Sequence, residues 1–272
     1  AQCLVGSEMC IRDRFLIGVV GPVRTGKSTF IRRFLEVLAL PAMEEQAKAE
    51  VRDQLPLSGS GTLITTVAPK FIPKEAVEIS LGENIPIRLR LIDCVGFLVP
   101  NATGNMENEK ERMVKTPWFE EAIPFHEAAE IGTRKVISQH STLGIIVTTD
   151  GSFGEIPREN FTEAEARTVE ELKKQGKPFL ILVNSVKPYK EETQKLTREL
   201  SEKYGASALA VNCDQLRGDD IVRILECLLY EFPLRQMEFY IPKWVELLPL
   251  QDPLKAELLE KIRDLTSDLK YI

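Results

Sequence analysis

A glycine-rich segment near the start of the chain carries the residues with the clearest chemical potential. Residues 21–29 read GPVRTGKST and fit the pattern G-x-x-x-x-G-K-[ST]. Glycines let the backbone turn tightly, so successive N–H groups point at phosphate oxygens, and the helix that follows adds its positive N-terminal dipole. Lys27 would bridge the β- and γ-phosphates of a nucleotide, and Ser28 would ligate Mg²⁺. The predicted nucleotide-binding residues of this loop are Gly21, Arg24, Thr25, Gly26, Lys27, Ser28 and Thr29.

A second motif, Asp-x-x-Gly, begins at Asp93 after an alternating strand at residues 87–92. Ligands of open α/β sheets bind at the carboxyl ends of the strands, which is where Asp93 stands. Its carboxylate suits a Walker-B role, reaching Mg²⁺ often through water, and the Gly96 N–H suits the γ-phosphate. Such a motif is common by itself, but downstream of a phosphate loop it indicates the metal-binding half of one site.

Thr65 and Thr66 lie between the two motifs. In P-loop switches a threonine at this place in the order senses the γ-phosphate and completes the Mg²⁺ shell. The alternative is a pair of strand threonines placed by ordinary β propensity, and the sequence does not separate the two residues. The predicted catalytic residues are Lys27, Thr65, Thr66 and Asp93, and the predicted metal ligands are Ser28, Thr66 and Asp93.

The choice of base depends on the tip of the apolar run at residues 179–183. This tip occupies the place of the guanine-specificity motif Asn-Lys-x-Asp. Asn184 is kept, but Ser185 replaces the lysine and Lys187 replaces the aspartate. That aspartate would accept hydrogen bonds from guanine, and a lysine cannot accept them. The substitution predicts ATP over GTP, with Asn184 and Lys187 at the nucleotide, although base-reading groups from other loops are an alternative.

Phe97 follows the second motif, at the position where many GTPases carry a glutamine that orients the attacking water. An apolar side chain cannot orient water. We therefore expect hydrolysis to be slow, or to be completed by a group from elsewhere such as a neighbouring subunit.

The elements around these motifs alternate between strand and helix. Strands are expected at residues 15–20, 87–92, 142–150, 179–183 and 208–213, and helices at residues 30–40, 42–54, 126–139, 162–175, 190–204 and 221–230. In the helix at 162–175, Thr162 is expected to cap the N-terminus with Glu165 three residues on. The order predicts an α/β fold of the P-loop NTPase type, with a mostly parallel sheet and helices on both faces.

Composition excludes several classes of protein. The chain has 272 residues, 43% hydrophobic and 28% charged, as in ordinary globular proteins. Its apolar runs are far shorter than the roughly 20 residues of a transmembrane helix. A net charge of -6 argues against nucleic acid or a bare anionic membrane as the primary partner. Five cysteines without a framework spacing fit a reducing compartment, and two histidines cannot build a zinc site alone.

Three segments of different character are expected along the chain. Residues 1–14 show no helix or strand period and resemble translated adapter sequence, with a natural N-terminal arm as the alternative. Residues 15–233 form the P-loop domain. Residues 234–272 begin as an extended crossing and end in a helix with an apolar stripe, which indicates the beginning of a truncated middle domain. A terminal helix that packs back on the NTPase is the alternative.

Four segments together resemble one known family. In chain order they read GPVRTGKSTFIRRF, TLITTVAPKFIP, LRLIDCVGF and FLILVNSVKP. They resemble the stage IV sporulation protein A family, the spore-coat morphogenetic ATPases of endospore-forming bacteria, from about residue 15 to the end of the chain. The resemblance implies an ATP-hydrolysing domain related to translation-factor-type GTPases, with ATP and Mg²⁺ as cofactors. Lys27, Thr65, Thr66 and Asp93 match the positions of the family's functional residues.

The same resemblance implies a biological role and a set of partners. Hydrolysis would drive self-assembly into a homopolymeric shell, the basement layer of the spore coat. Other coat proteins and a small amphipathic membrane-anchoring protein would be partners, with only peripheral membrane contact. The location would be the mother-cell cytoplasm, at the outer forespore membrane surface. Two alternatives stay open: a regulatory GTPase-like switch that recruits an effector, and a structural protein that binds nucleotide without turnover.

Overall fold

The computed structural model describes residues 2–4, 14–43, 45–56, 68–81, 85–102, 106–107, 110–233 and 236–267. The chain divides into two compact units. One unit contains residues 13–228, and the other contains residues 1–12 together with residues 229–272.

A six-stranded sheet forms the centre of the first unit, in the order β11-β10-β9-β2-β4-β3. The strands are β2 (Arg14–Val20), β3 (Lys70–Leu81), β4 (Ile85–Asp93), β9 (Leu143–Thr149), β10 (Phe179–Asn184) and β11 (Ala208–Val211). All neighbouring pairs are parallel except β3 with β4. Because the carboxyl ends of parallel strands meet at one edge, the loops after β2, β4, β9 and β10 lie close together.

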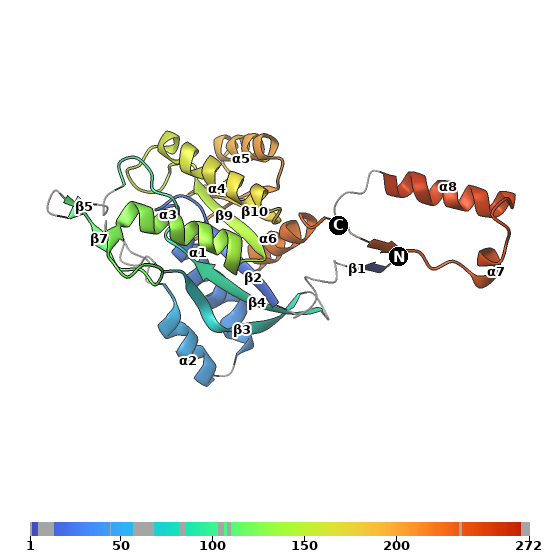
Figure 1. The fold of residues 1–272 in the computed structure, drawn as a ribbon, viewed down its shortest axis with the longest axis horizontal. Helices are drawn as coiled ribbons and strands as arrows, with labels where there is room; N and C mark the ends of the chain where they lie inside the picture. Colours follow the sequence, from blue (N-terminus) through green and yellow to red (C-terminus); the bar gives the residue numbers. More distant parts are fainter. Residues whose placement is uncertain are drawn as a thin grey trace. The chain divides into compact units, whose positions relative to one another are not determined.

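Helices cover both faces of this sheet (Figure 1). They are α1 (Lys27–Phe34), α2 (Glu45–Gln54), α3 (Phe125–Lys135), α4 (Thr162–Lys174), α5 (Glu191–Tyr204) and α6 (Gly218–Tyr230). Helix α1 continues as a π-helical turn at Leu35–Ala39, and α3 does the same at Val136–His140. The expected α/β fold with a mostly parallel sheet, typical of a P-loop NTPase, is confirmed.

The central strands are buried on both faces. Every residue of β9 and of β10 is buried, as expected for parallel strands covered by helices on both sides. On one face, Ile146 and Ile181 pack in a single apolar cluster with Val169 and Leu172 of α4. This packing fixes the strand ends that carry the motif loops.

Strand β3 was not among the expected strands, although Lys70–Leu81 is the longest strand in the described part of the chain. Pro73 and the charged residues that follow it interrupt the apolar pattern, and the pairing with β4 shifts register between Ile72 and Val77. A bulge of this kind hides the alternation from a sequence reading.

Short ribbons connect β4 to α3. They are β5 (Met106–Glu107) paired with β6 (Lys110–Glu111), and β7 (Met113–Val114) paired with β8 (Ile123–Pro124).

The expected capping role of Thr162 and Glu165 is wrong. A 3₁₀ turn, Arg158–Phe161, precedes α4, and the Thr162 hydroxyl donates to Glu159 O instead of capping the helix. Glu165 is fully buried, and its carboxylate accepts bonds from Thr148, Arg158 and Tyr204. A sequence pattern cannot show that a first-turn glutamate faces the core.

The second unit contains β1 (Gln2–Leu4), paired antiparallel with β12 (Gln236–Glu238), and the helices α7 (Lys243–Glu246) and α8 (Pro253–Ser267). Asp252 accepts the Leu254 N–H at the start of α8, as side-chain oxygens commonly do at a helix N-terminus. The side chains of Leu254 and Leu265 are exposed. That residues 1–14 are foreign and that residues 234–272 open a truncated domain stay predictions. No helix in the described parts of the chain combines the length and the apolarity that crossing a membrane requires.

Candidate nucleotide-binding site

The glycine-rich loop connects β2 to α1 and needs glycine at two of its positions. Gly21 and Gly26 have φ values of 130° and 94°, which L side chains rarely adopt. A Cβ on Gly21 would lie 2.4 Å from the Val147 carbonyl oxygen, and one on Gly26 would lie 2.5 Å from Nδ2 of Asn184. The loop backbone therefore lies directly against the tips of β9 and β10.

Arg24 adopts the same left-handed backbone region without being glycine, with φ 63°. Such a conformation costs about 1–2 kcal/mol for a residue with a Cβ, and it persists where the surrounding structure enforces it. The neighbouring Thr25 is buried, and its hydroxyl donates to Pro22 O over 3.0 Å. The loop is thus held in shape from inside, while the Arg24 side chain is exposed.

Lys27 lies folded back over this loop. Its side chain is buried, and Nζ donates to Pro22 O over 2.6 Å and to Gly21 O over 3.4 Å. Burial lowers the pKa of Lys27 from its ordinary value, and the nearby Asp93 carboxylate opposes this shift. A buried ammonium beside backbone N–H groups is suited to phosphate oxygens, which would supply the missing negative charge.

Asp93 and Ser28 form the metal-binding half of the arrangement. Ser28 Oγ donates to Asp93 Oδ2 over 3.1 Å. The other carboxylate oxygen, Oδ1, is buried and has no hydrogen-bond partner among the described residues. Burial raises the pKa of Asp93, and the charge of Lys27 opposes this shift. A buried oxygen that lacks a partner, beside a hydroxyl, fits a hard cation with oxygen ligands.

These two groups would hold Mg²⁺, which would neutralise the charge that develops on a transferred phosphoryl group. Within the described part of the chain, no cluster of three or more His, Cys, Asp or Glu residues could bind a metal by itself. One carboxylate beside a hydroxyl suits Mg²⁺, which typically takes one or two carboxylates and completes its shell with substrate phosphates and water.

Asn184 connects three loops. Its Nδ2 donates to Thr25 O over 3.0 Å, and its Oδ1 accepts the Cys213 N–H over 3.0 Å. The side chain therefore joins the phosphate loop to the segments that follow β10 and β11. Lys187, three residues further on, is exposed. It lines a cavity of about 440 Å³ together with Asp150, Ser152 and Thr193.

Phe97 is fully buried instead of facing the site. Its carbonyl accepts the Val23 N–H over 2.9 Å, its side chain packs with Val23 and Phe161, and the Arg167 guanidinium lies 4.8 Å from the ring centre. Phe97, at the position where many GTPases carry glutamine, thus connects the second motif to the phosphate loop.

Thr133 lies beside Gly96 of the second motif, and the sequence patterns did not indicate this residue. The Gly96 N–H donates to Oγ1 of Thr133 in α3 over 3.2 Å. The available signal was a threonine on the apolar face of this helix, four residues after Ala129 and three before Val136. A threonine there has an ordinary structural explanation, so its spacing alone predicted nothing.

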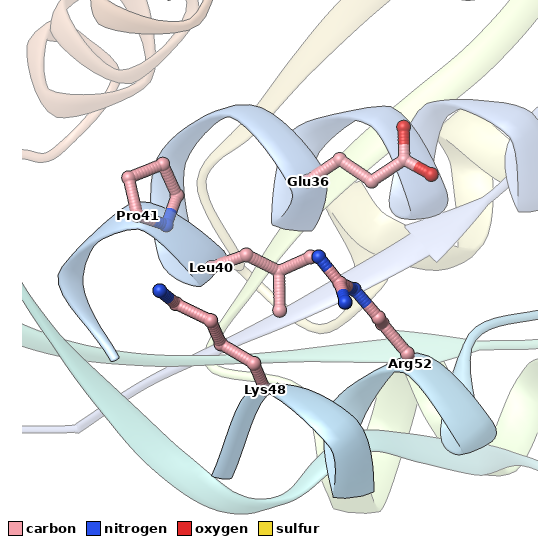
Figure 2. Close-up of a pocket in the computed structure, with 5 residues that line it drawn as sticks. All are labelled: Glu36, Leu40, Pro41, Lys48 and Arg52. Atoms are coloured by element: carbon pink, nitrogen blue, oxygen red, sulfur yellow. The ribbon is translucent and has the colours of Figure 1, made fainter. Parts of the chain in front are cut away.

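The structure brings Lys27, Ser28 and Asp93 of the two motifs to one edge of the sheet, with Asn184 against the phosphate loop. The cavity that Lys187 lines includes no residue of the phosphate loop or of the second motif. Thr65 and Thr66 lie outside the described residues. A second cavity, of about 430 Å³, lies between the end of the α1 segment and α2 (Figure 2). It is lined by Glu36, Leu40, Pro41, Lys48 and Arg52 and includes no residue of the phosphate loop.

Alanine at Gly26 is expected to disturb both folding and binding. Strain at φ 94° and the approach to Asn184 act together there. Gly205, at φ 59° with open space around it, is the matched control for strain alone. In denaturant unfolding, Gly205→Ala should lower the unfolding free energy by about 1 kcal/mol. Gly26→Ala should lower it further and also weaken nucleotide binding, and equal losses in the two variants would contradict the close approach.

Comparison with known proteins agrees with the geometry. Residues 10–233 match the model of the stage IV sporulation protein A ATPase domain. Stage IV sporulation protein A of Bacillus subtilis (strain 168) is 46% identical over 257 residues, covering 94% of this chain and 52% of that protein. Its counterpart in Clostridioides difficile (strain 630) is 45% identical with the same coverage. The chain thus spans about half the length of these relatives. It belongs to the stage IV sporulation protein A family and carries the ATPase domain of that family.

Proposed function

We propose that this chain binds Mg²⁺ and ATP at the site described above, that it hydrolyses the ATP, and that hydrolysis drives self-assembly of a spore-coat layer. The observation that carries the nucleotide chemistry is the buried cluster of Lys27, Ser28 and Asp93 at the phosphate loop, with one carboxylate oxygen left without a partner. The assembly part is supported by membership of a sporulation family.

Each residue has a distinct role in this proposal. The loop N–H groups and Lys27 bind the phosphates, and Ser28 and Asp93 hold the cation. Thr65 and Thr66 sense the γ-phosphate, and one of them, Thr66 in our assignment, completes the metal shell. Because Phe97 is buried in the core, the group that orients the attacking water has to come from elsewhere.

We propose ATP as the nucleotide because Lys187 replaces the aspartate that would accept guanine hydrogen bonds. Lys187→Asp should shift the ratio of GTP to ATP dissociation constants toward GTP by about 10-fold to 100-fold, since hydrogen bonds to charged groups contribute about 1.5–3 kcal/mol. Titration with each nucleotide measures this ratio. Lys190→Asp, also exposed in this loop, is the control and should leave the ratio unchanged. An unchanged ratio in Lys187→Asp would remove the argument for base selection.

The assembly proposal extends to partners and location. Self-association is the primary interaction. The other partners are coat proteins and a small amphipathic membrane-anchoring protein at the forespore surface, on the mother-cell side.

Light scattering and sedimentation test self-assembly. Wild type should scatter increasingly with ATP and Mg²⁺ and stay dispersed with ADP. If Lys27→Ala assembled as wild type does, hydrolysis would not drive the process.

The burial of Phe97 favours one alternative, a scaffold that binds nucleotide without turnover. The light-scattering and sedimentation assays described above also distinguish this alternative from assembly driven by hydrolysis. For a scaffold without turnover, a non-hydrolysable ATP analogue would drive assembly as well as ATP does, and no phosphate would be released.

A further inference from the structure

Thr133 and Gly96 form a buried contact between α3 and the second motif. Thr133 is fully buried, and its hydroxyl donates to Ala129 O over 2.8 Å within α3. The same oxygen accepts the Gly96 N–H over 3.2 Å. The hydroxyl therefore uses its proton and one lone pair, and the Gly96 N–H is satisfied by a side chain.

The position of Gly96 makes this contact relevant to the nucleotide. A Cβ on Gly96 would lie 2.1 Å from Gly21 O and 2.7 Å from Nζ of Lys27, so its backbone lies against the phosphate loop and the ammonium that would bind the terminal phosphate. An N–H makes one strong, well-aligned hydrogen bond. The Gly96 N–H can serve Thr133 or a γ-phosphate, but not both at full strength.

We propose that Thr133 is a positioning residue that holds the Gly96 N–H when the terminal phosphate is absent and releases it when a nucleoside triphosphate binds. This inference rests on the proposed function, in which Gly96 donates to the γ-phosphate. In the empty and diphosphate states the bond to Thr133 keeps α3 attached to the second motif. In the triphosphate state the phosphate oxygen replaces the hydroxyl, and α3 loses that attachment.

Removal of the acceptor should favour the triphosphate. Thr133→Val keeps the shape of the side chain but removes the oxygen acceptor of the Gly96 N–H in the empty and diphosphate states, leaving only the weak sulfur acceptor of Cys94. An unsatisfied buried N–H is unfavourable, so we expect the ratio of the ADP dissociation constant to that of a non-hydrolysable ATP analogue to rise about tenfold. A purely structural role would weaken both ligands together and leave the ratio unchanged.

Two variants serve as controls. Thr133→Ser keeps the hydroxyl and should retain the wild-type ratio. Thr168→Val removes a hydroxyl of the same burial, which bonds to the carbonyl four residues earlier in α4 as Thr133 does in α3. It should also retain the wild-type ratio, which would show that loss of a bond within a helix is not the cause.

The experiment measures both dissociation constants, with Mg²⁺ present, in wild type and the three variants. Amide exchange at Gly96 is followed in the wild type with and without the analogue. We expect slow exchange without nucleotide, because the N–H is bonded in the core. Fast exchange there, or a ratio in Thr133→Val within twofold of wild type, would overturn the inference while ATP binding stands. If the wild type bound neither ligand, the proposed function itself would fail, and this inference with it.

Discussion

Replacement of Lys27 by alanine is expected to reduce ATP turnover by about 10²–10³-fold, the effect typical of removing one preorganised donor to developing negative charge. The Lys27 ammonium is buried and held at the phosphate loop by the Gly21 and Pro22 carbonyls, whereas the Arg24 side chain of the same loop is exposed. Phosphate release under saturating ATP and Mg²⁺ measures the loss.

A fold control accompanies this measurement. Lys27→Ala should still unfold cooperatively in denaturant without nucleotide, because the loop keeps the Thr25–Pro22 and Asn184–Thr25 hydrogen bonds. ATP at about 100 times its dissociation constant should stabilise wild type by about 2.7 kcal/mol and the variant far less. Lys174→Ala, at an exposed position of α4, should behave as wild type in both assays. Full turnover in Lys27→Ala would show that this loop is not the hydrolytic site.

Asp93→Asn is expected to abolish the Mg²⁺ dependence of turnover and to lower the rate by at least about 10²-fold, because a bound cation contributes several kcal/mol of charge stabilisation. Asparagine preserves the volume and can still accept the Ser28 hydroxyl, so the change removes mainly the charge. Turnover measured over a Mg²⁺ titration, with a chelator as the zero point, gives both quantities.

Asp150→Asn is the matched control for this change. Asp150 follows β9 as Asp93 ends β4, but its carboxylate accepts bonds from Thr193 and the Ser152 N–H. Its replacement should therefore leave the Mg²⁺ dependence intact. The metal assignment would be wrong if Asp93→Asn kept a wild-type Mg²⁺ profile or if Asp150→Asn lost it.

Local patterns made much of the fold and site predictable. The unbroken apolar runs of β9 and β10 indicated central strands, and both are entirely buried. The phosphate loop and Asp93 were each recognisable from a few adjacent residues that follow a strand. Because parallel strands direct their carboxyl ends to one edge, the sheet order then placed Asp93 beside Ser28.

The features that the patterns did not indicate depend on contacts between distant segments. Thr133 meets Gly96 across 37 positions of sequence, and Glu165 meets Tyr204 across 39. Asn184 was predicted to touch the nucleotide, whereas its visible bonds join the phosphate loop to the segment after β11. In each case the residue type is compatible with an ordinary structural role, and only the tertiary packing shows which residue it contacts.

The most direct test of the central claim is phosphate release from ATP and from GTP, each with and without Mg²⁺, using Lys27→Ala as the blank. The expected result is release from ATP with Mg²⁺ well above the blank, slower release from GTP, and none above the blank without Mg²⁺. Preferential hydrolysis of GTP, or equal release from ATP by wild type and Lys27→Ala, would contradict it.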